Sequence, residues 1–194
     1  FQAPVFYVAG TGSSWIAAAD FNGDGKADLV TTDYNTGAVL VLLGNGDGTF
    51  RPPASIAVGT GISYGMVGDF NGDGKLDLAV SGGSSGALSV LLGKGDGTFQ
   101  APKNYAVGND LQSIAMADFD GDGKTDVAVW RPSNGNWYII NSGNGSITLV
   151  NWGVSGDQPV ASDYDGDGKA DLAVWRPSNG TWFIIKSSNG ATQT

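Results

Sequence analysis

The sequence DFDGDGKTD, at residues 118–126, recurs in three further copies and governs how the rest of the chain is interpreted. The other copies are DFNGDGKAD at 20–28, DFNGDGKLD at 69–77 and DYDGDGKAD at 163–171. In each copy Asp or Asn stands at positions 1, 3, 5 and 9, and these side chains supply the hard oxygen ligands that calcium prefers. The glycine at position 6 allows the chain to turn sharply around an ion. The repeated stretch therefore predicts four calcium-binding loops.

These loops differ from the helix–loop–helix calcium motif, in which position 12 carries a bidentate Glu. Position 12 holds Thr31, Val80, Val129 and Val174, and an apolar run typical of a β-strand follows each loop. A tight β-hairpin has no second conformation for the ion to favour, as a calcium sensor requires. We therefore expect the ion to hold two strands of a sheet together.

The composition favours an all-β protein. Gly accounts for 32 of the 194 residues, and the chain contains no Glu, His or Cys. The absence of His and Cys excludes a Ser–His or Cys–His nucleophile pair and any imidazole or thiolate metal site. A protein that depends on calcium needs a calcium-rich environment, so an extracellular or cell-surface location is expected.

The negative charge is concentrated in the four loops. The net charge is −9, and 14 of the 19 Asp residues lie inside the loops, so four bound calcium ions would leave about −1. The ten Lys and Arg residues are scattered, which argues against a nucleic-acid partner. No apolar run approaches the length of a membrane span, and none is predicted.

The spacing of the loops predicts the architecture. They begin at residues 20, 69, 118 and 163, and the resulting periods of 49, 49 and 45 residues are typical of propeller blades. Each period contains one apolar run before the loop, one after it, a third beyond a turn rich in Gly, Ser and Asn, and an outer fourth run. The chain is thus predicted to be an all-β β-propeller with four-stranded antiparallel blades. We expect one domain, 1–194, with blades at about 11–58, 59–107, 108–153, and 154–187 plus 1–10.

The last of these blades is split between the two ends of the chain. Residues 1–10, FQAPVFYVAG, match FQAPKNYAVG at 99–108, the fourth strand of the second repeat. The last repeat reaches a third strand at 181–186, and a full fourth strand does not follow it. We therefore expect the N-terminal strand to complete the last blade and close a ring without exposed edges. Two alternatives remain open: another copy completes the blade through self-association, or the chain is part of a longer array.

Two recurring patterns carry a family resemblance. The pattern D-F-[ND]-G-D-G-K-x-D followed by [LV]-A-V, together with the turn G-D-G-T-F-Q-A-P, resembles FG-GAP or VCBS repeats. Such repeats form the propeller blades of integrin α-subunit heads, of many secreted bacterial proteins and of some fungal lectins. The resemblance implies calcium ligation by four side chains and the position 7 carbonyl of each loop. These ligands are Asp20, Asn22, Asp24, Lys26 and Asp28; Asp69, Asn71, Asp73, Lys75 and Asp77; Asp118, Asp120, Asp122, Lys124 and Asp126; and Asp163, Asp165, Asp167, Lys169 and Asp171.

The expected function is that of a secreted, calcium-stabilised, non-catalytic binding, adhesion or structural scaffold module, whose partner is an extracellular protein or a glycan. A carbohydrate-binding lectin is the alternative, and a polysaccharide-active enzyme domain ranks third. The enzyme ranks low because no Glu or His can serve as a tuned acid or base. The only Asp residues outside the loops are Asp33, Asp47, Asp96, Asp110 and Asp157.

Partner recognition is expected on the loops that face away from the calcium loops, since exposed loops on a rigid scaffold usually carry it. Aromatic rings there would stack on sugars, and charged side chains would bind hydroxyls. An ion pair of Arg131 or Arg176 with an Asp of an adjacent loop is an equal alternative. The tryptophans at 130, 175, 137 and 182 are expected to pack within or between blades. The candidate ligand-binding residues are Trp15, Tyr34, Tyr64, Asp110, Arg131, Asp157 and Arg176.

Overall fold

The computed structural model describes residues 5–82, 86–109, 111 and 113–194, and its regular structure there consists of β-strands alone. The strands form four sheets, each with four antiparallel strands in sequence order, as predicted for propeller blades. No helix in this described part is long and apolar enough to cross a membrane. The first sheet contains β1 (Ser13–Ala19), β2 (Asp28–Asp33), β3 (Ala38–Leu42) and β4 (Ala54–Ala57), and the second contains β5 (Ile62–Gly68), β6 (Asp77–Gly82), β7 (Ala87–Leu91) and β8 (Lys103–Ala106).

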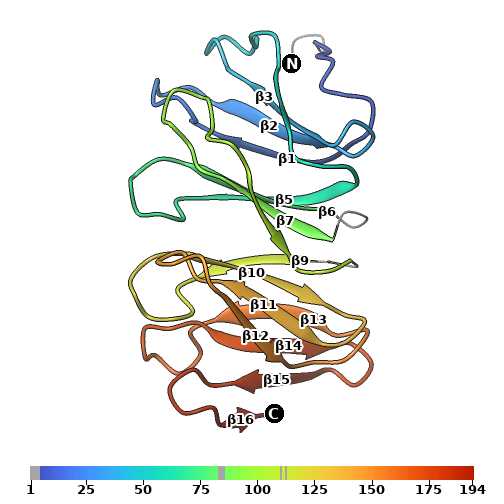
Figure 1. Cartoon of the computed structure of the whole chain (residues 1–194), viewed down its shortest axis with the longest axis vertical. Helices are drawn as coiled ribbons and strands as arrows, with labels where there is room; N and C mark the ends of the chain where they lie inside the picture. The colour runs from blue at the N-terminus through green and yellow to red at the C-terminus, as the bar shows by residue number, and fades with distance from the viewer. Residues whose placement is uncertain (1–4, 83–85, 110, 112) are drawn as a thin grey trace.

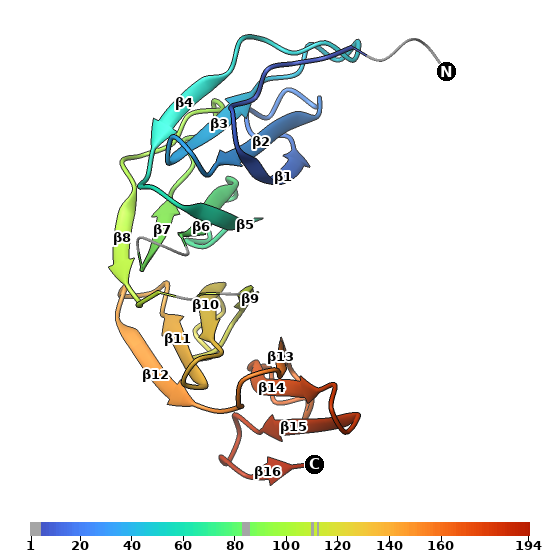
Figure 2. The ribbon, with the colours of Figure 1, turned by 90° about the vertical axis from the view of Figure 1, so that its right-hand side faces the viewer.

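The four sheets are stacked one after another in sequence order (Figure 1), and the stack is curved into an arc (Figure 2). Figure 2 shows β1, β5, β9 and β13 toward the concave side of the arc, and β4, β8 and β12 on the convex side. The third sheet contains β9 (Ser113–Ala117), β10 (Asp126–Arg131), β11 (Asn136–Ile140) and β12 (Ile147–Asn151), and the fourth contains β13 (Gln158–Ser162), β14 (Asp171–Arg176), β15 (Thr181–Ile185) and β16 (Thr192–Gln193).

The middle strands of the first three sheets are largely apolar because they are covered on both faces. All five residues of β3 and all six of β6 are buried, whereas exposed and half-buried positions alternate along the innermost strand β1. A strand buried on both faces is expected to be a continuous apolar run, and one with a solvent-facing side is expected to alternate. In β15 of the last sheet, by contrast, no side chain is fully buried.

The hydrophobic core is divided into three clusters, one in each gap between neighbouring sheets. Val30 and Val41 of the first sheet meet Leu78 and Leu91 of the second in one cluster. Equivalent clusters fill the gap between the second and third sheets and the gap between the third and fourth. The burial that stabilises the fold therefore arises mainly where one blade stacks on the next, as expected for a repeat architecture.

The N-terminal segment does not complete the last sheet, in contrast to the prediction. Residues 5–12 form no strand, and the last sheet has its own fourth strand, β16. The segment is held to the first sheet instead, because the Thr11 amide donates to Asp33 Oδ2 at 3.1 Å and Tyr7 packs edge-on against Phe50. The N-terminal segment and the C-terminus lie at opposite ends of the open arc (Figure 2). Completion of the blade by another copy remains a prediction.

Candidate metal centres

The four acidic loops occupy equivalent places in the fold, each connecting the first and second strands of a sheet. In the first loop Gly23 and Gly25 have φ values of 74° and 78°. This left-handed conformation favours glycine, because a Cβ there would clash with the backbone. The repeated glycines therefore allow each loop to bend back on its own first residue.

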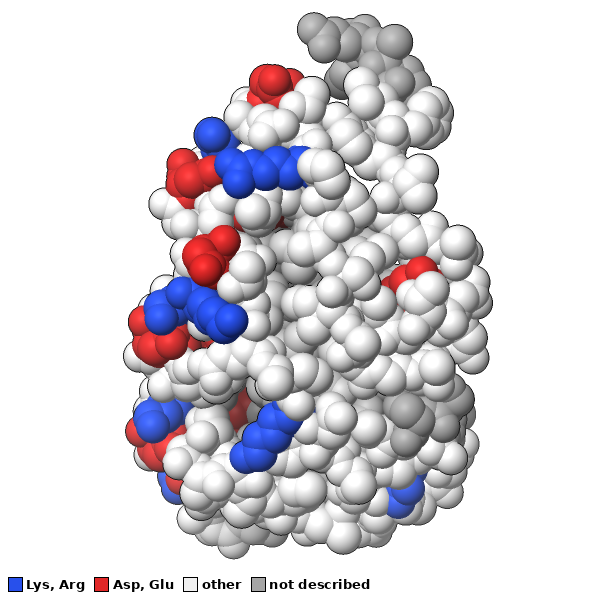
Figure 3. Space-filling view, turned by 45° about the horizontal axis from the view of Figure 1, so that its top comes forward, with Lys and Arg blue, Asp and Glu red and all other residues white. Residues whose placement is uncertain are grey.

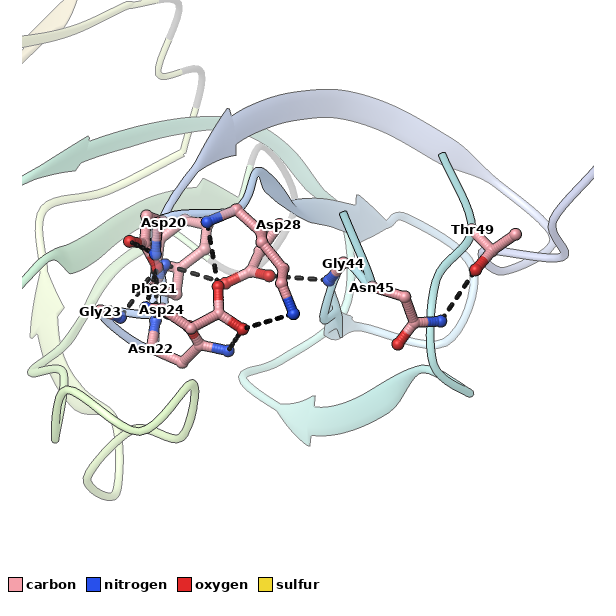
Figure 4. Close-up of polar contacts among 11 residues, drawn as sticks. Asp20, Phe21, Asn22, Gly23, Asp24, Asp28, Gly44, Asn45 and Thr49 are labelled. Atoms are coloured by element: carbon pink, nitrogen blue, oxygen red, sulfur yellow. Dashed lines mark hydrogen bonds and ion pairs between the residues drawn. The ribbon is translucent and has the colours of Figure 1, made fainter. Parts of the chain in front are cut away.

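The first Asp of each loop organises the backbone of that loop. Asp20 Oδ1 accepts a hydrogen bond from the Gly23 amide, and Oδ2 accepts one from the Gly25 amide, both at 2.8 Å (Figure 4). The Gly25 amide is the main reason that the pKa of Asp20 lies below its ordinary value, since its hydrogen bond favours the charged carboxylate. Asp20 is thus held ionised in an orientation set by the loop itself.

The Asp at position 9 is fully buried in all four loops and ties the loop to the end of the third strand. Asp28 Oδ2 accepts from the Phe21 amide at 3.0 Å, and Oδ1 accepts from the Gly44 amide at 2.7 Å (Figure 4). Asp77, Asp126 and Asp171 each accept the same pair of amide hydrogen bonds. From the sequence these residues were predicted only as ligands, and this structural role was not predicted. The available signal was their place directly before a buried apolar strand.

Carboxylates from positions 1, 3 and 9 converge in the third and fourth loops. Oxygen atoms of Asp118, Asp120 and Asp126 lie within 4.8 Å of one another, and Asp163, Asp165 and Asp171 form the same cluster. Burial is the main cause that raises the pKa of Asp120, and the neighbouring charge of Asp126 adds to it.

One oxygen of the fourth cluster has no hydrogen-bond partner among the described residues. Asp165 Oδ1 is buried and accepts no hydrogen bond, although its other oxygen accepts one from the Ser188 hydroxyl at 2.6 Å. A buried carboxylate oxygen without a partner is costly unless a cation or donor satisfies it. Hard carboxylate oxygens are also the donors that Ca²⁺ prefers, so the residues present fit this ion.

The position 5 carboxylates lie apart from these two clusters. Asp122 and Asp167 each accept a hydrogen bond from the amide of the position 7 lysine, at 2.9 and 2.8 Å. In the first two loops, Asp24 and Asp73 also form ion pairs with the lysine of their own loop at 3.7 Å. In the third and fourth loops the structure therefore brings positions 1, 3 and 9 together, and position 5 caps the turn. The position 7 carbonyls remain predicted ligands.

On the face drawn in Figure 3, most charged side chains lie along one edge. Figure 3 shows Lys and Arg side chains alternating with Asp side chains along one edge of the molecule, while most of the remaining visible surface is uncharged. This alternation agrees with loops in which a lysine at position 7 stands between the Asp residues at positions 5 and 9.

Three of the candidate ligand-binding residues are aromatic, and the structure places them differently. Trp15 is half-buried, and its ring lies against Gly65 of the second sheet, where any Cβ would clash with it. Tyr34 and Tyr64 are 47% and 43% exposed. Trp15 therefore packs between blades, whereas both tyrosines are accessible to a partner.

The charged candidates bind one another or a neighbouring ring. Arg176 donates to both oxygens of the buried Asp157 at 2.7 and 2.9 Å and lies over the Phe183 ring. The hydrogen bond from Arg176 is the main reason that the pKa of Asp157 is lowered. Arg131 stacks on Tyr138 and donates to its hydroxyl. Asp110, proposed as its alternative partner, lies outside the described residues.

The tryptophans differ according to their sheet. Trp130 and Trp137 are fully buried between the third and fourth sheets, and the indole N–H of each donates to the Trp152 carbonyl at 3.1 Å. Their counterparts in the last sheet are half-buried Trp175 and exposed Trp182. Packing between blades is therefore confirmed for the third sheet.

Comparison with known proteins returns one family. A family model described as an FG-GAP-like repeat matches residues 20–80, 69–129 and 118–174. The three matches overlap and together cover residues 20–174, well over half of the chain. Each begins at the first Asp of one acidic loop and ends beyond the next loop. No curated protein sequence matches the chain.

Proposed function

The chain belongs to the FG-GAP-like repeat family, and from this premise we propose that it is a secreted, calcium-stabilised binding or scaffold module without catalytic activity. The observation that carries the proposal is the convergence of three carboxylates in a loop that joins two strands, with the buried Asp165 Oδ1 left unpartnered. Such a module acts outside the cell or at its surface, where calcium is abundant.

The side chains at positions 1, 3 and 9 would hold the ion in each blade, with position 5 and the position 7 carbonyl completing the set. When bound, calcium supplies positive charge that neutralises the converging carboxylates. The position 1 residue keeps the loop closed through its amide hydrogen bonds, and the position 9 residue links that loop to the third strand. The four loops would thus stiffen equivalent points of the four blades.

A calcium titration by calorimetry tests the four sites. We expect four bound ions per chain, and the double variant Asp120→Asn/Asp165→Asn should bind two of them several-fold more weakly. The reason is that asparagine contributes a neutral oxygen, as Asn22 and Asn71 already do in the first two loops. Because those loops tolerate Asn, the variant should still fold.

The matched control is Asp47→Asn/Asp96→Asn, which removes two carboxylates that bind threonines in turns outside the loops. This control should leave the stoichiometry and the affinities unchanged. Failure of the wild-type chain to bind calcium, or an equal loss in both double variants, would contradict the assignment.

The bonding of the remaining carboxylates supports the absence of catalysis. Asp33 is buried and accepts amide hydrogen bonds from Thr11 and Asn35, and Asp157 is paired with Arg176. A general acid or base must be free to exchange a proton with substrate. Within the described residues, the Asp side chains outside the loops are instead engaged in structural contacts.

Carbohydrate binding is the second candidate, and the two exposed tyrosines favour it. The Gly61 amide donates to the Tyr34 carbonyl at 3.3 Å, so the segment that leads to Tyr64 lies beside Tyr34. A glycan array probed in calcium should show one bound class of glycan, and Tyr34→Ala/Tyr64→Ala should weaken it at least tenfold, since ring stacking is lost. If the wild-type protein binds no glycan on the array, the lectin candidate is wrong.

A further inference from the structure

The gap between the first and second sheets and the gap between the second and third sheets differ at the turn that follows the third strand of a sheet. Between the first and second sheets, the turn GKGDGT at residues 93–98 reaches across the gap, and the Gly97 amide donates to the Phe21 carbonyl at 3.0 Å. The next residue after this turn, Phe99, is buried and packs edge-on against the Phe21 ring at 5.9 Å. Gly97 also lies against Leu43. This gap is therefore filled by an aromatic ring.

The corresponding turn of the third sheet is shorter. Gly93 and Ser142 occupy equivalent positions, because their amides donate to the buried carboxylates Asp77 and Asp126. The second sheet continues beyond Gly93 to a turn closed by a hydrogen bond from the Lys94 amide to the Thr98 carbonyl. The third sheet is already closed by a hydrogen bond from the Asn141 amide to the Ser146 carbonyl. An aromatic residue equivalent to Phe99 therefore does not reach the gap between the second and third sheets.

A cavity of about 330 Å³ lies in that gap. Its apolar wall includes Phe70 and Leu92, which correspond to Phe21 and Leu43 of the filled gap, together with Val127 and Ile140. The wall that receives an aromatic ring in one gap is thus present in the next gap, while the ring itself is missing. Concave sites of this size with apolar walls and a few polar groups are typical of small-molecule binding.

Two polar groups of the cavity are available to a ligand. Ser142 Oγ is buried and has no hydrogen-bond partner in the described part of the chain. Lys103 lines the cavity, with its Nζ 5.1 Å from the centre of the Tyr105 ring. The ion pairs of the described residues join other side chains, so within that part of the chain Lys103 has no carboxylate partner within 4 Å. A cation and an unsatisfied hydroxyl together fit an anionic acceptor.

We propose that this cavity binds a small aromatic carboxylate. The ligand's ring takes the place that Phe99 fills in the preceding gap, and its carboxylate accepts hydrogen bonds from Lys103 and Ser142. Lys103 Nζ lies beside Gly145, so the cation is at the turn that forms one wall of the cavity. The cavity adjoins the third acidic loop, because the Ser142 amide donates to Asp126, but the proposed ligand contacts do not depend on the calcium assignment.

The test uses phenylacetate, with its neutral isostere phenylacetamide, added to the calcium-saturated protein and followed by ¹H–¹⁵N NMR. We expect phenylacetate to shift the amide signals of Ser142, Gly143 and Gly145, with a dissociation constant of about 1 mM or tighter for a ligand of this size. Lys103→Gln should weaken phenylacetate about tenfold, because one charge-assisted hydrogen bond is lost, and should leave phenylacetamide nearly unchanged. Ser142→Ala should weaken the binding of both ligands, because the hydroxyl donor is lost. The variant should still fold, since the equivalent residue of the second sheet is Gly93, which has no side chain.

Lys94→Gln is the matched control, because Lys94 belongs to the longer turn of the second sheet and does not line the cavity. It should leave phenylacetate binding unchanged. The proposal is overturned if phenylacetate shifts no signals around the cavity, or if Lys103→Gln and Lys94→Gln behave alike. Equal binding of the acid and the amide by the wild-type protein would likewise exclude a site for carboxylates.

Discussion

Removal of calcium is expected to lower the melting temperature of this protein by about 20 °C or more. At about 1 mM calcium and a dissociation constant of about 10 µM, each site adds roughly 2.7 kcal/mol to the free energy of unfolding. Four such sites would add about 11 kcal/mol, which is comparable with the whole net stability of a typical domain. For a chain of this size each kcal/mol corresponds to about 2–4 °C. Circular dichroism melts in excess EDTA and in calcium measure the shift.

The structure explains why the calcium-free protein should have a low free energy of unfolding. Burial and the like charges of Asp73 and Asp69 raise the pKa of Asp77, and burial with Asp126 has the same effect on Asp120. Without a cation, these carboxylates repel one another inside loops that anchor the first two strands of each blade. EDTA presaturated with calcium is the control and should leave the melt unchanged. A melt that is the same with and without free EDTA would falsify the structural role of calcium.

The four-blade architecture and the acidic clusters followed from the sequence because both depend on local, repeated signals. The loop spacing gave the period, and alternate Asp residues across glycines gave the converging positions 1, 3 and 9. The double role of Asp28 was not visible, because its second hydrogen bond comes from Gly44, which is distant in sequence. The capping role of position 5 was also missed, since a ligand and a turn cap require the same residue type there.

The N-terminal segment was misplaced for a related reason. Its sequence similarity to residues 99–108 indicated a fourth strand. Sequence similarity between repeats does not, however, identify the sheet against which the segment packs. Asp33, identified from the sequence only as an Asp outside the calcium loops, accepts a hydrogen bond from the Thr11 amide and holds the segment at the first sheet. The Phe99 difference between the gaps was equally hidden, because a turn that is four residues shorter changes the packing against the neighbouring blade. Sequence repeats therefore predicted each blade better than the contacts between blades.

Trp137→Ala should cause the second large loss of stability, about 3–5 kcal/mol in calcium, as expected for removal of a fully buried aromatic side chain. Trp137 is 1% exposed between the third and fourth sheets, and the hydrogen bond from its indole to the Trp152 carbonyl would also be lost. Chemical denaturation in urea, fitted for the free energy of unfolding, measures the effect.

Trp182→Ala is the matched control, because Trp182 has the same strand position and the same cross-strand tryptophan neighbour in the last sheet. Trp182 is 45% exposed, so removal of its side chain should cost about 1 kcal/mol or less. The difference between the variants isolates the stacking of one blade on the next, since strand, residue type and pairing are shared. Equal losses of unfolding free energy in the two variants would mean that contacts within a blade, which both tryptophans share, determine how much each stabilises the protein. Packing between blades would then contribute little to stability.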